Sequence, residues 1–146
     1  MSEQRCPASF RSAFFGEPAH VTLEPGERLY KLVSLPLVRD RALQSPWWIR
    51  QLASTELQVR SRRLHRPLRD LVRAHLAIAV QWNPGLEVLW IVHLADAADG
   101  WEGRARAQRL SLDDPKALLL GGGQQVCVPG LTWRQVAMDQ TAHIAA

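Results

Sequence analysis

The sequence predicts an α+β protein in which short strands surround one long helical insertion. Three stretches carry this prediction. Residues 86–94, LEVLWIVHL, form the longest run rich in β-branched and apolar side chains, which is typical of a central strand. Residues 54–81 place apolar side chains at helical spacing. Residues 118–130, LLLGGGQQVCVPG, join an apolar run to a short alternating strand through consecutive glycines.

The composition is that of one ordinary globular domain. The chain has 146 residues, of which 47% are hydrophobic and 22% charged. Its formal charge of +4 rests almost entirely on arginine, because Lys31 and Lys116 are the only lysines. A GC-rich genome favours arginine, so this charge alone is weak evidence for nucleic-acid binding. Cys6 and Cys127 are too few for a metal cluster or a disulfide framework, and we expect free thiols in a reducing compartment.

Neither a membrane span nor a secretory signal is expected. No segment reaches the roughly 18 consecutive apolar residues of a spanning helix. The opening residues, MSEQRCPASF, lack the apolar core of a signal peptide. We therefore expect a chain that is cytoplasmic when made and that would need a dedicated machine for any export.

The first elements are an arm and a strand. Residues 1–20 are expected to form an N-terminal arm with little regular structure, and residues 21–146 a single domain. Residues 24–27, EPGE, suit a type II turn. Residues 28–33 then alternate as a strand that carries the cations Arg28 and Lys31 near its start. The alternative for Lys31 is a solvated strand lysine.

A polar loop through residues 39–41 leads to a second short strand or turn, SPWWIR, which begins at Ser45. Trp47 and Trp48 are consecutive, so on a strand they face opposite ways. One is then free to line a groove while the other packs inward. The alternative is that both tryptophans are structural.

The helical insertion divides at Pro67. Ser54 or Thr55 is expected to cap the first helix, and Pro67 to be the first residue of the second. One face of the second helix is apolar, and His75 on that face is expected to be a hydrogen-bonded core histidine. The helical region as a whole also carries a basic face, which is either a solvated surface or a site for an anionic partner; its residues are Arg60, Arg62, Arg63, Arg66, Arg69 and Arg73.

The later elements follow from turns and alternation. Residues 83–85, NPG, predict a turn before the central strand, and His93 in that strand is expected to face away from any cleft. Residues 96–100 are expected to form a loop, and Trp101 lies near the start of the strand after it. Residues 113–119 are expected to contain a helical turn. TWRQVAM is expected to be the last strand.

Gln125 is the leading candidate for a functional residue. It follows three glycines, which let the backbone approach a ligand closely. On a strand, Gln125 and Cys127 share one face while Val126 and Val128 share the other. Metal-binding, nucleophile-elbow and phosphate-loop motifs are absent from the sequence, and its five histidines are scattered, so no metal site is expected.

The order of these parts resembles the ADP-ribosyltransferase superfamily, and most of all the NAD glycohydrolase toxins of the tuberculosis necrotizing toxin type. LEPGERLYKL is similar to the family's first strand, which implies Lys31, Arg28 and Tyr30 as cofactor-binding residues. SPWW is similar to the second-strand serine patch, which implies Ser45, Trp47 and Trp48 beside nicotinamide. GGGQQVCVPG is similar to the catalytic strand, which implies Gln125 as the catalytic residue; the resemblance also assigns Gly122 and Gly123 to the cofactor site.

The resemblance implies a split β-sheet core with a helical insertion, NAD as a substrate and no metal. It also implies a toxin or effector domain used in interbacterial competition, with an immunity protein as its partner. Lys31 stands where the family usually has arginine, and a lysine there would bind phosphate less tightly. Gln125 replaces the glutamate of most transferases. Because glutamine is no general base, hydrolysis is favoured, and transfer to a protein or RNA acceptor stays open.

The alternative function belongs to another class. It is a non-enzymatic interaction or adaptor protein whose arginine-rich helix binds an acidic protein or RNA. A catalytically inactive relative of the toxins lies between the two hypotheses.

Overall fold

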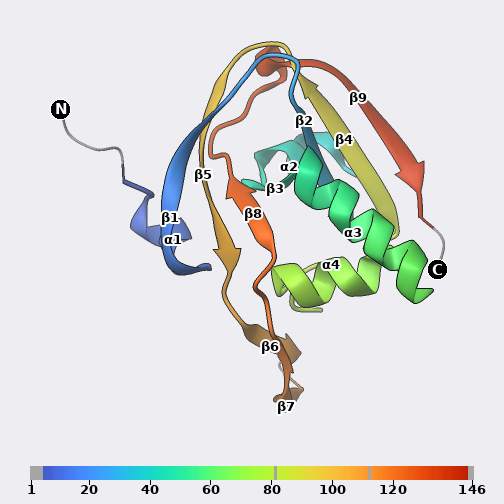
Figure 1. The fold of residues 1–146 in the computed structure, drawn as a ribbon. Coiled ribbons are helices and arrows are strands. Elements are labelled where there is room, and N and C mark those ends of the chain that lie inside the picture. Colours follow the sequence, from blue (N-terminus) through green and yellow to red (C-terminus); the bar gives the residue numbers. More distant parts are fainter. Residues whose placement is uncertain (1–4, 81, 112, 145–146) are drawn as a thin grey trace.

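The computed structural model describes residues 5–80, 82–111 and 113–144, and it confirms the α+β class. One antiparallel sheet has the strand order β1-β5-β8-β3-β2-β4-β9, and β6 and β7 form a separate hairpin. In Figure 1, β1, β5 and β8 lie on the left, β4 and β9 on the right, and the β6–β7 hairpin below them. The elements along the chain are α1 (Ala8–Arg11), β1 (Phe14–Leu23), β2 (Arg28–Val33), α2 (Arg39–Gln44), β3 (Trp47–Arg50), α3 (Gln51–Leu64), α4 (Leu68–Leu76), β4 (Val88–Leu94), β5 (Ala98–Ala105), β6 (Gln108–Ser111), β7 (Asp114–Leu119), β8 (Gln124–Cys127), the 3₁₀ helix η1 (Trp133–Gln135) and β9 (Val136–His143).

The sheet is split between β2 and β3. These strands pair only at Leu29 with Arg50 and at Tyr30 with Ile49. Beyond that point β2 continues along β4 as far as Val33, whereas β3 pairs with β8. The sheet therefore consists of two halves that are joined by a short ladder and separate on one side of it.

Two apolar clusters lie on opposite faces of β2. Leu29 and Val33 pack with Trp48 and Trp90 in one cluster. Tyr30 and Leu32 pack in the other cluster with residues from the two long helices, among them Leu57, Leu71 and Val72. A strand that is covered on both faces needs apolar residues at consecutive positions, which explains the sequence RLYKLV.

The expectation of an irregular N-terminal arm is wrong for residues 14–20, which belong to β1 and pair with β5. Residues 1–4 of that arm lie outside the described residues. The register of β1 shifts between Phe15 and Ala19, and this bulge accommodates Gly16, with a φ of 80°, and Pro18. Proline is tolerated there because β1 is an edge strand. Gly16 and Pro18, which suggested an irregular segment, therefore lie in a β-bulge.

The boundaries of the helices also differ from the prediction. The polar loop through residues 39–41 is the first turn of α2. Helix α3 begins at Gln51, directly after β3, so Ser54 and Thr55 lie inside it and do not cap it. Pro67 was expected to be the first residue of α4, but it is the N-cap, and the helix begins one position later at Leu68. The expected helical region continued to Gln81, which lies outside the described residues, but α4 ends at Leu76.

Three later predictions need correction. The helical turn expected over residues 113–119 is instead strand β7, because this segment pairs with β6. Residues 98–100, expected in a loop, start β5. The expected last strand opens with the single turn η1, and β9 begins only at Val136. Among the described residues, no helix has the length and apolar character needed to cross a membrane.

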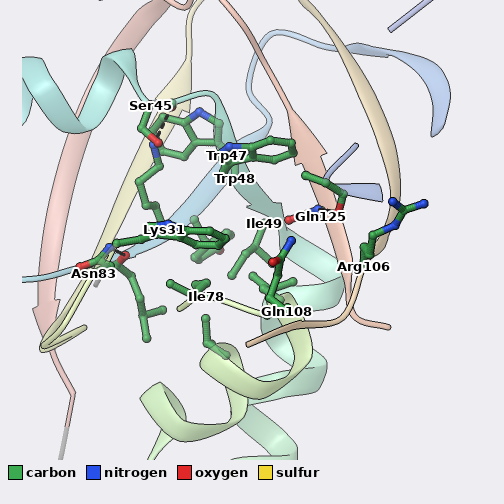
Figure 2. A pocket seen from close by; sticks show the side chains of 17 residues that line it. Lys31, Ser45, Trp47, Trp48, Ile49, Ile78, Asn83, Arg106, Gln108 and Gln125 are labelled. Atoms are coloured by element: carbon green, nitrogen blue, oxygen red, sulfur yellow. Dashed lines mark hydrogen bonds between the residues drawn. The ribbon is translucent and has the colours of Figure 1, made fainter. Parts of the chain in front are cut away.

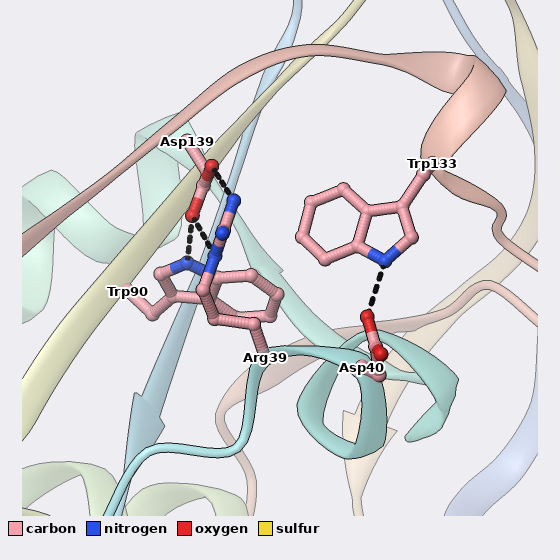
Figure 3. A network of polar contacts seen from close by, with 5 residues as sticks. All are labelled: Arg39, Asp40, Trp90, Trp133 and Asp139. Carbon is pink, nitrogen blue, oxygen red and sulfur yellow. Dashed lines mark hydrogen bonds and ion pairs between the residues drawn. The ribbon is translucent and has the colours of Figure 1, made fainter.

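A polar network holds α2 against the end of the chain (Figure 3). Arg39 Nε donates to Asp139 Oδ2 at 2.9 Å, and Trp90 Nε1 donates to the same oxygen at 2.9 Å. Trp133 Nε1 donates to Asp40 Oδ1 at 2.7 Å. The Arg39 guanidinium lies 4.8 Å from the centre of the Trp133 ring. These contacts connect the start of α2 to β4, η1 and β9.

This network should make stability depend on pH. Burial by itself would raise the pKa of Asp139, but hydrogen bonds from Arg39 and Trp90 outweigh burial and lower that pKa. A carboxylate with a lowered folded pKa adds stability above its unfolded pKa of about 4 and loses it as pH falls through the folded value. We expect Asp139→Asn to lower the free energy of unfolding by about 1–2 kcal/mol at pH 7.

Urea denaturation at several pH values tests this expectation. The difference between the wild-type chain and Asp139→Asn should shrink as pH falls below about 4. The matched control is Asp96→Asn, which changes an exposed carboxylate and should change stability by less than about 0.5 kcal/mol. A difference for Asp139→Asn that stays constant from pH 7 to pH 3 would contradict the role of its charge.

Candidate active site

A cavity of about 370 Å³ lies where β2 and β3 separate. Its walls come from β2, from β3 with Ser45 before it, from α4 with the loop after it, and from β6 and β8; Ala13, before β1, and Arg106, after β5, complete the lining. Figure 2 shows Lys31 and Gln125 on opposite sides, with Trp47 and Trp48 above and Ile78 and Gln108 below in this view. The lining residues are Ala13, Tyr30, Lys31, Leu32, Ser45, Trp47, Trp48, Ile49, Val72, Leu76, Ala77, Ile78, Trp82, Asn83, Arg106, Gln108 and Gln125.

Gln125 is buried and lines this cavity. Strand β8 holds it between β3 and β5, where Gly103 is its partner in the register. Its Nε2 donates to the Ala13 carbonyl at 3.3 Å. The same carbonyl accepts the backbone N–H of Arg106 at 3.0 Å. This bond fixes the amide so that Oε1 stays available to accept a hydrogen bond from a ligand.

Lys31 reaches the cavity from β2 but makes its polar contacts with α2. Its Nζ donates to the carbonyls of Ala42, at 2.6 Å, and Ser45, at 2.8 Å. Nζ also lies 3.9 Å from the centre of the Trp48 ring. Only 8% of Lys31 is exposed, and desolvation by this burial lowers its pKa to about 7. The side chain is therefore not a solvated strand lysine.

The two tryptophans face opposite ways, as the alternation in the sequence predicts. Trp47 packs against the rings of Phe10 and Phe14, with centroid distances of 6.1 and 5.5 Å. Trp48 packs against Trp90 in the core at 5.5 Å. Both tryptophans nevertheless line the cavity, and Ser45 lines it just before them. The aromatic wall is therefore supported from both faces of the sheet.

Three of the predicted cofactor-binding residues do not line this cavity: Arg28, Gly122 and Gly123. Arg28 lies at the other end of β2, before the short ladder with β3. The glycines pack against protein backbone, because Gly122 N–H donates to the Ala105 carbonyl and Gly123 N–H to the His75 carbonyl, both at 2.8 Å. His75 also contacts Arg60 at 3.1 Å.

Sequence reasoning missed Arg106, Gln108, Trp82 and Asn83, all of which line the cavity. They come from irregular segments or from the short strand β6, where no periodic pattern marks a functional position. Ala13 was missed because residues 1–20 were treated as an arm. A lining that includes two cations and, among the described residues, no carboxylate favours an anionic ligand.

Cys127 lies two residues after Gln125 and is fully buried, like Cys6. Burial, and to a smaller extent Cys6, raise the pKa of the Cys127 thiol to about 12. Cys127 is thus a neutral thiol at physiological pH and no thiolate nucleophile. Within residues 5–80, 82–111 and 113–144, no group of His, Cys, Asp or Glu side chains could hold a metal ion.

A second hollow of about 460 Å³ lies at the junction of α3 and α4. Arg62, Arg66 and His65 line it, together with Ile144 near the end of the chain. Arg62 and Arg66 belong to the arginine-rich face that the sequence offers as a site for an anionic partner. This hollow and the first cavity are lined by different residues.

Comparisons with known proteins concern the fold alone. No protein-family model matches the chain, and no curated protein matches it in sequence. The structure of Tne2 in complex with Tni2 is similar, with 12% identity, a TM-score of 0.57, and coverage of 88% of this chain and 92% of that chain. The structure of Rhs1-CT in complex with its cognate immunity protein RhsI1 is also similar, with 15% identity, a TM-score of 0.60, and coverage of 91% and 86%. Each likeness extends over most of both chains.

Proposed function

We propose that this chain is a bacterial toxin domain that cleaves the bond between nicotinamide and ribose in NAD. The observation that carries the proposal is that Gln125 lines one cavity together with Ser45, Trp47 and two cations, Lys31 and Arg106. Lys31 and Gln125 come from strands in different halves of the split sheet. The sequence resemblance implies Gln125, Ser45, Trp47 and Lys31 around a single dinucleotide.

The structural neighbours support the toxin class. Rhs1-CT was solved with a cognate immunity protein and Tne2 with Tni2, and both share the fold over most of their length. We infer that this chain also has a cognate immunity protein, which protects the producing cell. An effector of this kind is made in the cytoplasm and delivered into a competitor by a secretion system.

The geometry of the cavity suits the chemistry of this cleavage. Breaking the C1′–N bond of the nicotinamide riboside gives an oxocarbenium-like ribose, as in glycoside hydrolysis. In this proposal Gln125 Oε1, whose amide is held by the bond from Nε2 to the Ala13 carbonyl, accepts a hydrogen bond from a ribose hydroxyl as positive charge develops. Trp47, which is only partly buried, provides a flat wall for the nicotinamide ring, whereas Trp48 is 1% exposed and is covered by Trp90 and Lys31.

The leaving group needs no strong general acid. Nicotinamide departs as a neutral molecule and takes the bonding electron pair with it. Water then adds at C1′ and releases a proton, which gives ADP-ribose. Glutamine cannot deprotonate a protein nucleophile, so we assign hydrolysis before transfer. In this proposal NAD is the substrate, and no metal takes part.

The test compares the amounts of the two products, nicotinamide and ADP-ribose. Purified protein is incubated with NAD, and free nicotinamide and ADP-ribose are measured by liquid chromatography. Hydrolysis predicts equal amounts of the two, whereas transfer to an acceptor predicts less ADP-ribose than nicotinamide. A folded protein that releases no nicotinamide at micromolar enzyme concentration would contradict the proposal.

The second hollow supports one alternative, a binding module for an acidic protein or RNA, because it gathers Arg62 and Arg66. That function predicts salt-dependent binding that is lost when Arg62, Arg63 and Arg66 are changed to glutamate. It also predicts that Gln125→Ala changes nothing. The two functions therefore give opposite results with the same pair of variants.

A further inference from the structure

We propose that the two cations of the cavity have separate tasks: Lys31 positions the tryptophan wall, and Arg106 binds the diphosphate of the dinucleotide. The second half rests on the proposed function, because it takes NAD as the ligand. The first half rests on the contacts of the ligand-free protein. The resemblance to the transferases would give the phosphates to Lys31, so this assignment is specific to the present chain.

The hydrogen bonds of the Lys31 ammonium group go to the C-terminal end of α2. A lysine ammonium has three N–H donors. Two bond the carbonyls of Ala42 and Ser45, at the C-terminal end of α2, where a cation also interacts favourably with the helix dipole. The group also lies over the Trp48 ring at 3.9 Å. A phosphate could reach Nζ only by replacing one of these partners.

Helix α2 determines where the aromatic wall begins. Its first turn is held by Arg39 and Asp40 through the network in Figure 3, and its last turn by Lys31. Two residues separate α2 from β3. The second of them, Pro46, accepts the N–H of Val128 at its carbonyl at 2.7 Å. Because both ends of α2 are anchored, Trp47 enters the cavity from a fixed position.

Arg106 has the opposite character. It is exposed, it lines the cavity, and its guanidinium makes no ion pair or hydrogen bond with any residue that the structure describes. Its backbone N–H and the Gln125 amide bond the same carbonyl, so the two residues lie side by side, as Figure 2 shows. A planar guanidinium can bind two phosphate oxygens through two parallel N–H donors, a rigid fork that a lysine ammonium lacks. The diphosphate of NAD would then lie next to the ribose held by Gln125.

The role of Lys31 is tested without any ligand. Lysine is labelled with ¹⁵N, and the two Nζ signals are assigned with Lys116→Arg, since Lys31 and Lys116 are the only lysines. At pH 6 the Lys31 ammonium protons should exchange with water at least about ten-fold more slowly than those of a free lysine, because they are bonded and buried. Free exchange would overturn the positioning role. In Lys31→Met, if it folds, amide exchange over residues 39–48 should accelerate.

The role of Arg106 is tested with two probes, ADP-ribose and inorganic pyrophosphate. Arg106→Gln should weaken the binding of both by about ten-fold or more, as loss of a charge-assisted pair predicts. Arg104→Gln changes an exposed arginine in β5, two residues before Arg106, and should change binding less than about two-fold. The Lys31 Nζ signal should not move when ADP-ribose saturates the wild-type protein.

The outcomes distinguish a failure of the division of tasks between Lys31 and Arg106 from a failure of NAD as the substrate. A shift of the Lys31 signal with ADP-ribose, together with unchanged binding by Arg106→Gln, would overturn the division of tasks. Binding of pyrophosphate without ADP-ribose would contradict NAD as the substrate while keeping Arg106 as an anion site. Failure of both probes to bind the wild-type protein would overturn the role of Arg106 but not that of Lys31.

Discussion

Gln125→Ala should lower the rate of nicotinamide release from NAD by about two to three orders of magnitude, the usual loss when one oriented hydrogen-bonding group at a transition state is removed. The amide is buried, and Ala13 fixes its orientation, so it needs no reorganisation when charge develops on the ribose. Alanine leaves no polar atom in its place. The effect should appear in kcat more than in KM, because the interaction strengthens in the transition state.

Gln124→Ala is the matched control. Gln124 precedes Gln125 in β8, is exposed, and faces the other side of the strand. Its replacement should leave the rate within about two-fold of wild type, because surface substitutions rarely alter stability or geometry. Equal losses in the two variants, or no loss in Gln125→Ala, would remove Gln125 from the catalytic site.

Gly121→Ala should lower the free energy of unfolding by about 3 kcal/mol or more. Gly121 has a φ of 72°, a conformation that costs any other L-residue about 1–2 kcal/mol. A Cβ at this position would also lie 2.5 Å from the Ala105 carbonyl oxygen and 3.0 Å from Arg106 backbone atoms. Backbone cannot move aside as the end of a flexible side chain can, so the strand connection itself would shift.

Gly122→Ala separates these two causes. Gly122 has a φ of 85°, but a Cβ there would meet nothing within 4 Å. Urea denaturation should therefore show only the conformational cost, about 1–2 kcal/mol. If the two variants were equally stable, close packing of the glycine run against β5 would not be the reason for glycine at position 121.

The strands next to the cavity could be predicted from local signals. A Pro-Gly turn precedes β2 and Pro36 follows it, which is why residues 28–33 were assigned correctly. SPWWIR was expected to be a short strand or turn beginning at Ser45, and β3 begins two residues later at Trp47. Alternation predicted that Gln125 and Cys127 share a face. These signals depend only on neighbours in the sequence.

The remaining features depend on tertiary structure. Gly16 and Pro18 suggested an irregular arm, but pairing with β5 turns this segment into a bulged edge strand. The neighbours of Lys31 depend on α2, a short helix in a segment that was expected to be a polar loop. Arg106 was missed because only the shared contact with Ala13 brings it beside Gln125. Long-range contacts of this kind leave no local pattern.

A crystal structure of Gln125→Ala with NAD would test the central claim most directly, because the variant should bind the substrate and turn it over slowly. The account predicts NAD in the cavity between β2 and β3, with its nicotinamide ring against Trp47 and its diphosphate at Arg106. NAD bound elsewhere, or a cavity without NAD at saturating concentration, would contradict it.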